Sequence, residues 1–299
     1  MRLKVGSRDA WIYTGVKPSM VPFVGPAAPP PPPTGGAPGV LRFNGSYSTG
    51  NFSQWPNVHN KFTTGSGSSY DALPPSYPAT IVSDPTYTWC ARFEARQGDH
   101  PSFDGTTVAR TEVSTDEAQA GGHVQNSVVW YDMNIKFDPS FPVNAASLGW
   151  TVLAQWHQSP TQAPVLTWCP SMLNNNLSLK IDEQDSSFNF VRGYSIYDIP
   201  ITRDVWINTR VQIKWSTAIN GGYVRLWVNG TRVNFLPPPS GNATGGSVGV
   251  TGGSPDPQTF IVQTMTPGQS SVYYKEGIYR NNAIAPTYII KHAGCKVYD

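Results

Sequence analysis

Two long strands and a tight turn can be recognised in residues 205–235, VWINTRVQIKWSTAINGGYVRLWVNGTRVNF. From Val205 to Trp215 every second residue is apolar or threonine, whereas the alternating residues from Asn208 to Lys214 are polar. A two-residue period places one set on each face of a β-strand. The segment therefore predicts a strand with one buried and one exposed face.

The turn is Asn229-Gly230, which favours a two-residue type I′ hairpin because both of its positions need a positive φ angle. It predicts that Tyr223–Val228 pairs with Thr231–Phe235. Residues 129–137, VWYDMNIKF, show the same alternation of apolar and polar side chains, and no segment of useful length has the 3.6-residue apolar period of a helix. Antiparallel strands of this kind predict an all-β sandwich, in which the inner faces of two sheets form the core.

The composition of the whole chain agrees with this prediction. Among the 299 residues, 28 are Gly and 28 are Pro, while charged residues make up 13% and aromatic residues 12%. So high an aromatic content is untypical of a disordered chain. Low charge together with abundant turn-forming residues favours many short strands over helices.

Charge, hydropathy and cysteine content exclude several classes of protein. The net charge is only +2 and no cluster of Lys and Arg stands out, so we expect no nucleic-acid partner. No run of about 18 apolar residues is present, so no membrane span is expected. The N-terminus lacks the apolar core of a signal peptide, which indicates synthesis and folding in a cytosol. The cysteines are too few and too scattered for a disulfide framework or a zinc site; they are Cys90, Cys169 and Cys295.

The composition also divides the chain into three parts. Residues 1–25 form a mixed N-terminal arm, and residues 26–39, PAAPPPPPTGGAPG, form a linker. Consecutive prolines favour extended polyproline II, and the glycines after them add a flexible joint. Residues 40–299 carry the strand pattern and are expected to form one β-sandwich domain. Within it, the Gly-rich stretch Pro237–Gly253 is predicted to be one long exposed loop.

Three short segments of this domain place polar residues side by side. They are VARTEV (residues 108–113), LAQWHQ (residues 153–158) and YYKEGIY (residues 273–279). Because alternate residues share a face of a strand about 6.6 Å apart, each segment presents a small polar group to one side. The residues that share such faces are Arg110 with Glu112, Gln155 with His157, and Tyr273 with Lys275 and Tyr279. Alternation directs Trp156 and Glu276 to the opposite side.

Each of these groups also has an ordinary structural explanation. Arg110 and Glu112 could form a salt bridge within a sheet, and His157 could be a hydrogen-bonded structural histidine. Tyr279 could be an aromatic surface on which a sugar stacks without reacting. The acidic run Asp182–Asp185 could hold calcium or form a solvated loop. The remaining histidines lie in loop-like contexts with no metal-ligand spacing between them; they are His59, His100, His123 and His292.

The three polar segments resemble the signature segments of alginate-lyase-type polysaccharide lyases. Those segments are usually RxEx, Q(I/V)H and YFKxGxY, and the corresponding residues here are RTEV, QWH and YYKEGIY. Flanking sequence is also similar to heparin- and glucuronan-lyase-like members, at Phe43-Asn44-Gly45, Arg92-Phe93-Glu94-Ala95-Arg96 and Trp215-Ser216. The similarity covers roughly residues 40–299. It implies a concanavalin-like β-jelly roll whose concave sheet binds a sugar chain.

In lyases of this type a uronic acid loses its C5 proton, and the 4-O-linked sugar leaves by β-elimination. The resemblance implies that Arg110 and Gln155 neutralise the substrate carboxylate and so stabilise the enolate that develops. It gives His157 a role in neutralisation or as base, and Tyr279 a role as base, as acid to the leaving group, or as both. No cofactor or metal is implied. The residues expected to bind substrate are Glu112, Lys275 and Tyr273.

A second resemblance concerns the N-terminal arm. Residues 1–18, MRLKVGSRDAWIYTGVKP, resemble the N-terminal segment of minor tail proteins from phages that infect mycobacteria and their relatives. This implies a virion tail protein made in the host cytoplasm, whose arm of residues 1–25 binds other tail proteins and whose domain binds host-surface glycan. Three functions stay open: a glycan-binding tail protein, an active uronate-polysaccharide lyase, and a purely structural tail component. A homo-oligomer is also left open.

Overall fold

The computed structural model describes most of the predicted domain and two short pieces of the arm. The described residues are 4–5, 8–9, 39–59, 77–100, 104–116, 124–143, 149–158, 164–171, 174–184, 190–238, 247–251 and 254–299. Within these ranges the chain forms strands, turns and bends without a helix, so the prediction of an all-β protein is confirmed. Accordingly, no helix that could cross a membrane occurs in the described part of the chain.

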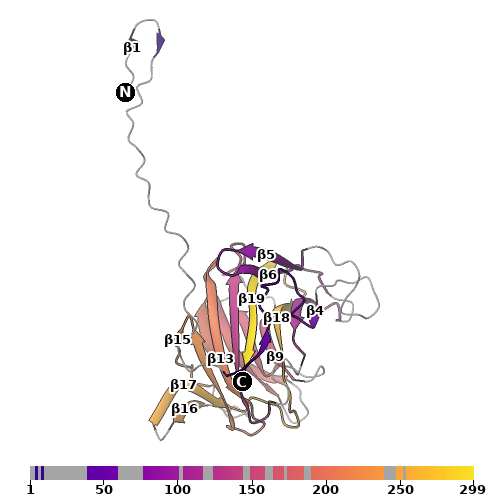
Figure 1. The fold of residues 1–299 in the computed structure, drawn as a ribbon, viewed down its shortest axis with the longest axis vertical. Helices are drawn as coiled ribbons and strands as arrows, with labels where there is room; N and C mark the ends of the chain where they lie inside the picture. Colours follow the sequence, from indigo (N-terminus) through magenta and orange to yellow (C-terminus); the bar gives the residue numbers. More distant parts are fainter. Residues whose placement is uncertain are drawn as a thin grey trace.

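Two antiparallel sheets make up the domain (Figure 1). The seven-stranded sheet contains, in spatial order, β12 (Phe190–Pro200), β11 (Asn176–Gln184), β10 (Leu166–Ser171), β9 (Thr151–His157), β18 (Tyr273–Asn281), β7 (Val108–Ser114) and β4 (Asn57–His59). The ten-stranded sheet contains, in spatial order, β16 (Ser247–Thr251), β17 (Ser254–Val262), β14 (Gly222–Val228), β13 (Trp206–Lys214), β8 (Val128–Phe137), β19 (Tyr288–Tyr298), β6 (Thr88–Ala95) and β5 (Ala79–Asp84), with β15 (Thr231–Arg232) beside β14 and β3 (Leu41–Asn44) beside β19. In the arm, β1 (Lys4–Val5) pairs with β2 (Arg8–Asp9).

The core lies between the two sheets and is rich in aromatic side chains. On β8, the alternate residues from Val129 to Phe137 are all buried, as the sequence predicts. Tyr131 of this strand contacts Trp156 and Tyr274 of the other sheet, with ring centroids 5.4 and 6.2 Å away. Burying a large apolar side chain stabilises the fold by about 1.5–3 kcal/mol. The alternation along the strands therefore determines which face of each sheet packs inward.

The strands predicted around Asn229-Gly230 form a hairpin. β14 and β15 pair on either side of the turn, and Asn229 and Gly230 have φ angles of 48° and 86°, both positive as a type I′ turn requires. β15 is shorter than the predicted Thr231–Phe235, because the chain turns to a different partner after Val233, whose N–H still donates to the Leu226 carbonyl of β14 at 3.1 Å. There the backbone N–H of Phe235 donates to the carbonyl of Pro257, at 2.8 Å.

The Gly-rich stretch after this hairpin corrects one prediction. Pro237–Gly253 does not form a single loop, since Ser247–Thr251 is strand β16 and pairs with β17. The sequence Ser-Val-Gly-Val-Thr places β-branched residues at alternate positions, and this β propensity outweighs the turn propensity of the glycines around it.

The two ends of the domain meet beside the ten-stranded sheet. Gly39 donates a backbone hydrogen bond to the Asp299 carbonyl, and Asp299 donates one to the carbonyl of Val40. β3 pairs with β19, which itself lies between β8 and β6. The arm of residues 1–25 apart from β1 and β2, and the linker of residues 26–39 apart from Gly39, lie outside the described residues. The division into arm, linker and domain therefore stays a prediction.

One carboxyl group is buried among hydroxyl groups between the sheets. Glu276 on β18 is fully buried, and its carboxyl accepts hydrogen bonds from Tyr47 at 2.8 Å and from Tyr274 at 3.3 Å. The Nδ1 atom of His292 lies 3.6 Å from the same carboxyl, on β19 rather than in the loop that we predicted for this histidine. Burial raises the pKa of Glu276 to about 8 and lowers the pKa of His292 to about 3. Both groups are therefore mainly uncharged near neutral pH, and Glu276 faces the core as alternation predicts.

The Glu276 carboxyl is expected to make stability depend on pH. Because its pKa rises on folding from 4.5 to about 8, its contribution to stability is complete below pH 4.5 and is lost as the pH rises to about 8. His292 acts in the opposite sense, below its usual pKa of 6.5. Between pH 6.5 and 8 the wild type should lose about 2 kcal/mol of unfolding free energy relative to Glu276→Gln, at about 1.4 kcal/mol per pH unit. Urea unfolding of both proteins measures this difference, and parallel pH profiles would contradict it.

Candidate active site

The predicted site residues lie on three neighbouring strands of the seven-stranded sheet. β9, β18 and β7 are adjacent, and their antiparallel register sets Tyr279 opposite Arg110 and Lys275 opposite Gln155. Cross-strand partners share one face of a sheet. The residues collected on this face, which we call the site face, are Arg110, Glu112, Gln155, His157, Tyr273, Lys275 and Tyr279.

A glycine brings β18 close to β7 at the centre of the site face. Gly277 lies opposite Glu112, and the pairing of β18 with β9 shifts by one residue between Glu276 and Tyr279. The φ angle of Gly277 is 137°, a value that residues with a Cβ atom rarely adopt. A Cβ atom there would overlap the carbonyl oxygen of Thr111 and would approach the Cα atom of Glu112 to 2.7 Å. The glycine of the YYKEGIY segment is therefore required by the backbone of the neighbouring RTEV segment.

Arg110 is held between two carboxylates and an aromatic ring. Its Nε atom lies 2.7 Å from Asp104 Oδ2, and its Nη1 atom lies 3.3 Å from Glu112 Oε2. Its Nη2 atom donates a further hydrogen bond to Asp104 Oδ1, at 3.4 Å. The guanidinium carbon lies 4.0 Å from the centre of the Tyr279 ring, as in a cation–π contact. The salt bridge between Arg110 and Glu112 thus exists, and Asp104 adds a second carboxylate.

A buried carboxylate connects Arg110 with Gln155. Glu112 is fully buried and accepts a hydrogen bond of 2.7 Å from the Gln155 amide nitrogen. A buried charge is tolerated when it is paired and hydrogen-bonded, and Glu112 has both kinds of partner. Glu112 therefore fixes the orientation of the two groups to which the resemblance assigns neutralisation of the substrate.

The other end of the site face is cationic and aromatic. Lys275 retains only 7% of its exposed area, and its Nζ atom lies 5.4 Å from the centre of the Tyr273 ring. Burial lowers the pKa of Lys275 to about 8, because the charged ammonium group is removed from water. Tyr273 also contacts His157, with ring centroids 5.0 Å apart. Near neutral pH the site face thus has a largely buried ammonium group beside two aromatic rings.

Further residues border the site face that no sequence pattern indicated. His59 belongs to strand β4, and not to the loop that we predicted, and it lies opposite Glu112 of β7. Burial lowers the pKa of His59 to about 4. Asp104 comes from the segment before β7. Trp150 directly precedes β9; it is 43% exposed, and its ring centroid lies 4.6 Å from that of Tyr279. A short edge strand and two positions outside strands carry no periodicity, so only the three-dimensional pairing brings these residues to the site.

Tyr279 carries a phenolic proton beside the Arg110 guanidinium. Burial raises its pKa above the usual 10, and the Arg110 guanidinium opposes this shift only in part. The phenol is therefore protonated near neutral pH. A phenol that gives up its proton beside a guanidinium leaves a phenolate that the positive charge stabilises. The site face can thus donate a proton and stabilise developing negative charge.

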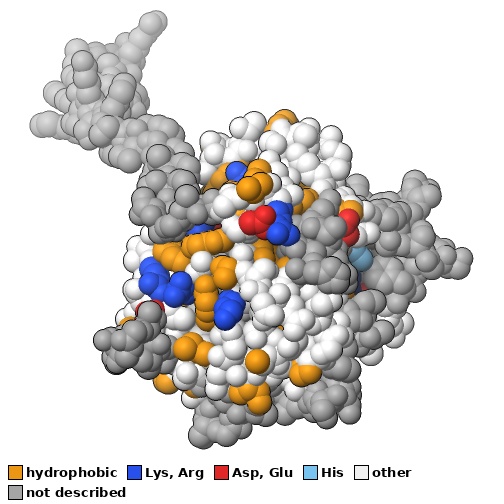
Figure 2. All heavy atoms as spheres, turned by 60° about the horizontal axis from the view of Figure 1, so that its bottom comes forward, with side chains coloured by type: hydrophobic (Ala, Val, Ile, Leu, Met, Phe, Trp, Pro, Cys, Tyr) orange, Lys and Arg blue, Asp and Glu red, His pale blue; other side chains and the backbone are white. Residues whose placement is uncertain are grey.

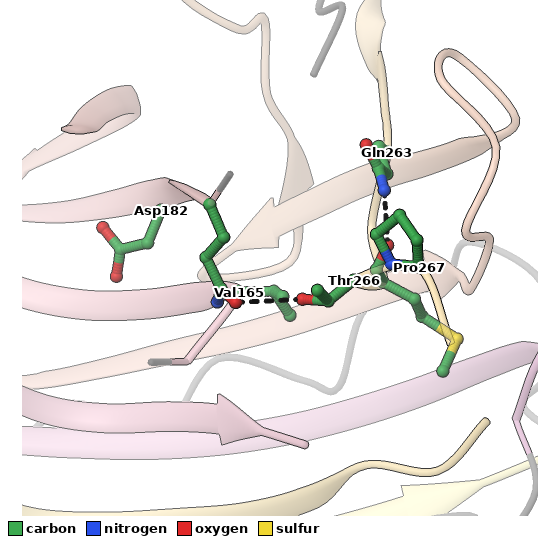
Figure 3. A pocket seen from close by; sticks show the side chains of 7 residues that line it. Val165, Asp182, Gln263, Thr266 and Pro267 are labelled. Atoms are coloured by element: carbon green, nitrogen blue, oxygen red, sulfur yellow. Dashed lines mark hydrogen bonds between the residues drawn. The ribbon is translucent and has the colours of Figure 1, made fainter. Parts of the chain in front are cut away.

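A small cavity lies elsewhere in the domain, between β11 and residues 263–267 (Figure 3). Its volume is about 20 Å³, which is enough for a water molecule and far too small for a sugar. Thr266 donates a hydrogen bond of 3.2 Å to Gln184 across it. Asp182, which lines the cavity, lies in β11, which extends to Gln184, so the first three residues of the acidic run form a strand and not the solvated loop that was one of its two interpretations. No cluster of His, Cys, Asp and Glu suited to a metal ion occurs in the part of the chain that the structure describes.

The charged side chains on the surface are dispersed. On the face seen in Figure 2, Lys and Arg side chains form small groups separated by hydrophobic and uncharged side chains. A nucleic-acid interface is typically a continuous basic patch or stripe. The described side chains on this face therefore form no such patch.

Comparison with known protein families gives one match. A family model described as polysaccharide lyase matches residues 47–293. The matched range contains all residues of the site face, together with His59, Asp104 and Trp150. No curated protein sequence matches the chain significantly.

Two solved structures with a similar fold belong to different classes of enzyme. The endo-β-1,4-glucuronan lyase from the fungus Trichoderma reesei is 13% identical, with a TM-score of 0.55 over 83% of this chain and 92% of that one. The catalytic domain of a glycoside hydrolase family 131 protein from Coprinopsis cinerea is 15% identical, with a TM-score of 0.50 over 87% of this chain and 95% of that one. At these identities the likeness establishes the fold alone, and it confirms the prediction of a jelly-roll sandwich.

Proposed function

The chain belongs to the polysaccharide lyase family, and from this we propose that its site face binds a uronate-containing polysaccharide and cleaves it by β-elimination. The observation that carries the proposal is the convergence of Gln155, Lys275 and Tyr279 beside Arg110 on adjacent strands. Elimination needs positive charge and hydrogen-bond donors where the enolate develops, and an acid where the leaving oxygen departs. The site face holds groups of each kind.

In the proposed reaction the uronate carboxylate binds beside the cations and the Gln155 amide. His157 takes the C5 proton, and the electrons of the C5–H bond form the C4–C5 double bond as the C4–O bond breaks. Tyr279 gives its proton to the departing oxygen, and Arg110, 4.0 Å from the Tyr279 ring, stabilises the phenolate. Water then returns the proton from His157 to Tyr279, so the step needs no oxidant or reductant. The raised pKa of Tyr279 favours its role as the acid over a role as the base.

The full chain is expected to release 4,5-unsaturated products from at least one uronate polymer. These products absorb in the ultraviolet, so the reaction can be followed directly on glucuronan, alginate and pectate. Cello-oligosaccharides are the neutral control, since without a carboxylate their C5 proton is not acidic enough for elimination. Glycan binding without an increase in absorbance would mean that the protein recognises the polymer but does not cleave it. If neither binding nor an increase in absorbance is found, a structural role is left.

For the biological setting, we infer that residues 1–25 attach the chain to other proteins of a phage tail and that the domain meets host-surface glycan. The support is the resemblance of residues 1–18 to the N-terminal segment of phage minor tail proteins. The proline-rich linker, residues 26–39, would hold the two parts away from each other. The protein would then be made in the host cytoplasm and carried in the virion tail. Deleting residues 1–39 should leave a folded domain that no longer enters particles, and normal incorporation would contradict this role.

A further inference from the structure

The two cations of the site face differ in how they are paired. Arg110 has both Asp104 and Glu112 as ion-pair partners. Among the residues that the structure describes, the Lys275 ammonium group makes neither a hydrogen bond nor an ion pair; it lies 5.4 Å from the centre of the Tyr273 ring, and the carboxylates of Glu112 and Asp104 act on it only at longer range. One cation thus already has two direct ion-pair partners in the protein, whereas the other has none in direct contact.

We propose that Lys275 receives the carboxylate of the uronate residue, and that Arg110 is a positioning residue which holds Tyr279 in place. This inference rests on the proposed function and assigns its recognition of acid to one side chain. It departs from the resemblance, which gives that role to Arg110. The following contacts support it.

A substrate carboxylate could reach the side of Arg110 only by competing with Asp104. The Asp104 carboxylate lies against two guanidinium nitrogens, as an ion pair with Nε at 2.7 Å and as a hydrogen bond from Nη2 at 3.4 Å, and so occupies this side of the guanidinium. The Asp104 side chain is only 17% exposed, so displacing it would leave a largely buried carboxylate without its partner. Arg110, Asp104 and Glu112 together carry a net negative charge, which repels a further anion.

Lys275 has the opposite character. Its charge is largely removed from water without a carboxylate in direct contact, and burial lowers its pKa to about 8 although Glu112 and Asp104 oppose this shift. A bound carboxylate would supply this direct contact and raise that pKa again. Gln155 lies directly opposite on β9 and can donate to the same anion. The titratable and charged groups that surround Lys275 are His59 from β4, Arg110 and Glu112 from β7, His157 from β9, Tyr273 and Tyr279 from β18, and Asp104 from the segment before β7.

Two tetrasaccharides that differ only at C6 separate recognition of the acid from recognition of the sugar. β-1,4-Linked tetraglucuronate carries a carboxylate where cellotetraose carries a hydroxymethyl group. Their binding is measured by titration calorimetry with the full chain carrying Tyr279→Phe, so that the acidic ligand is not cleaved. This variant is called the parent, and all further substitutions are made in it. If alginate is the polymer cleaved, the corresponding mannuronate and mannose tetrasaccharides replace this pair.

At pH 7 the parent is expected to prefer the acidic ligand, and Lys275→Gln should lose most of this preference. The preference, which is the ratio of the two association constants, should fall by about 30-fold or more, as when one member of a desolvated charge pair is removed. The double variant Arg110→Gln/Asp104→Asn is the matched control, because it removes an ion pair and leaves the net charge unchanged. This control should retain the preference, while the same change in the active enzyme should lower kcat because Tyr279 loses its guanidinium neighbour.

The pH dependence gives a second, independent readout. In the parent, the preference should fall by up to about tenfold per pH unit above pH 8, as Lys275 loses its proton. Lys275→Arg should keep the preference and lose this fall, because a guanidinium remains charged throughout the range. Glu276 titrates near the same pH, and its negative charge would disfavour the acidic ligand more than the neutral one. The pH profiles of the parent and of Lys275→Arg are therefore both measured in a Glu276→Gln background.

The outcomes separate this inference from the function on which it rests. A preference that survives in Lys275→Gln and disappears in the double variant would overturn the role of Lys275 and leave the lyase proposal intact. A fall through pH 8 that persists in Lys275→Arg would overturn it as well, and this comparison decides the matter if Lys275→Gln does not fold. If the Tyr279→Phe parent binds neither ligand and the wild type releases no unsaturated product, both the role of Lys275 and the proposed lyase function are contradicted.

Discussion

Replacing Tyr279 by phenylalanine is expected to lower kcat for β-elimination by about 10²–10⁴-fold, the range for the loss of a general acid. The substitution removes the proton that is given to the leaving oxygen. It keeps the ring against Arg110 and Trp150, which lie 4.0 and 4.6 Å from it. KM should therefore change little. Initial rates of ultraviolet-absorbing product at saturating substrate measure the effect.

Tyr273→Phe is the matched control for this prediction. Tyr273 lies on the same strand and the same face, and its ring contacts His157 and Lys275. Loss of its hydroxyl should lower kcat far less, because this group is not placed to protonate the leaving oxygen. Equal losses in the two variants, or a Tyr279→Phe enzyme with nearly wild-type kcat, would rule out the acid role of Tyr279.

The second large effect is expected at Gly277, a position without a side chain. Gly277→Ala should destabilise the domain by on the order of 3 kcal/mol or more, through backbone strain and overlap with β7. The φ angle of 137° disfavours alanine, and the new Cβ atom would press on the backbone of Thr111 and Glu112. Since Glu112 holds Arg110 and Gln155, activity should fall together with stability. Chemical unfolding and product formation, measured on the same preparation, test both.

Gly98→Ala separates the two causes. Gly98 also has a positive φ angle, 92°, but a Cβ atom there would have no neighbour within 4 Å. This variant should lose only about 1–2 kcal/mol, the cost of the left-handed conformation for a residue with a Cβ atom. If Gly277→Ala were no less stable than Gly98→Ala, the close approach of β18 to β7 would not be the reason for a glycine in the YYKEGIY segment.

Patterns within short stretches of sequence were sufficient to predict the strands that have one apolar and one polar face. The alternation from Val129 to Phe137 and the turn at Asn229-Gly230 both depend on residues near one another in sequence, and the structure confirms both. The same period predicted that Arg110 and Glu112 share a face and that Glu276 points away from it. Within a strand, the sequence alone therefore determines which side chains point toward the site.

Pairing between distant strands was not predictable in the same way. The shift of register at Gly277 and the approach of His59 to Glu112 depend on how separate strands align, and no local pattern records that alignment. Asp104 was missed for a related reason, since it precedes its strand and meets Arg110 only once the segment folds back. The pairing of Arg110 with Asp104 matters most here, because it changes which cation is available to a substrate.

The ten-stranded sheet cannot be completed until β19 has been synthesised. β19 follows the other described strands in sequence, yet it lies between β8 and β6 and also pairs with β3 at the start of the domain. During translation β8 and β6 therefore leave the ribosome with unpaired edges, and unpaired edges promote association between chains. The ten-stranded sheet can therefore be completed only after its last described strand emerges from the ribosome.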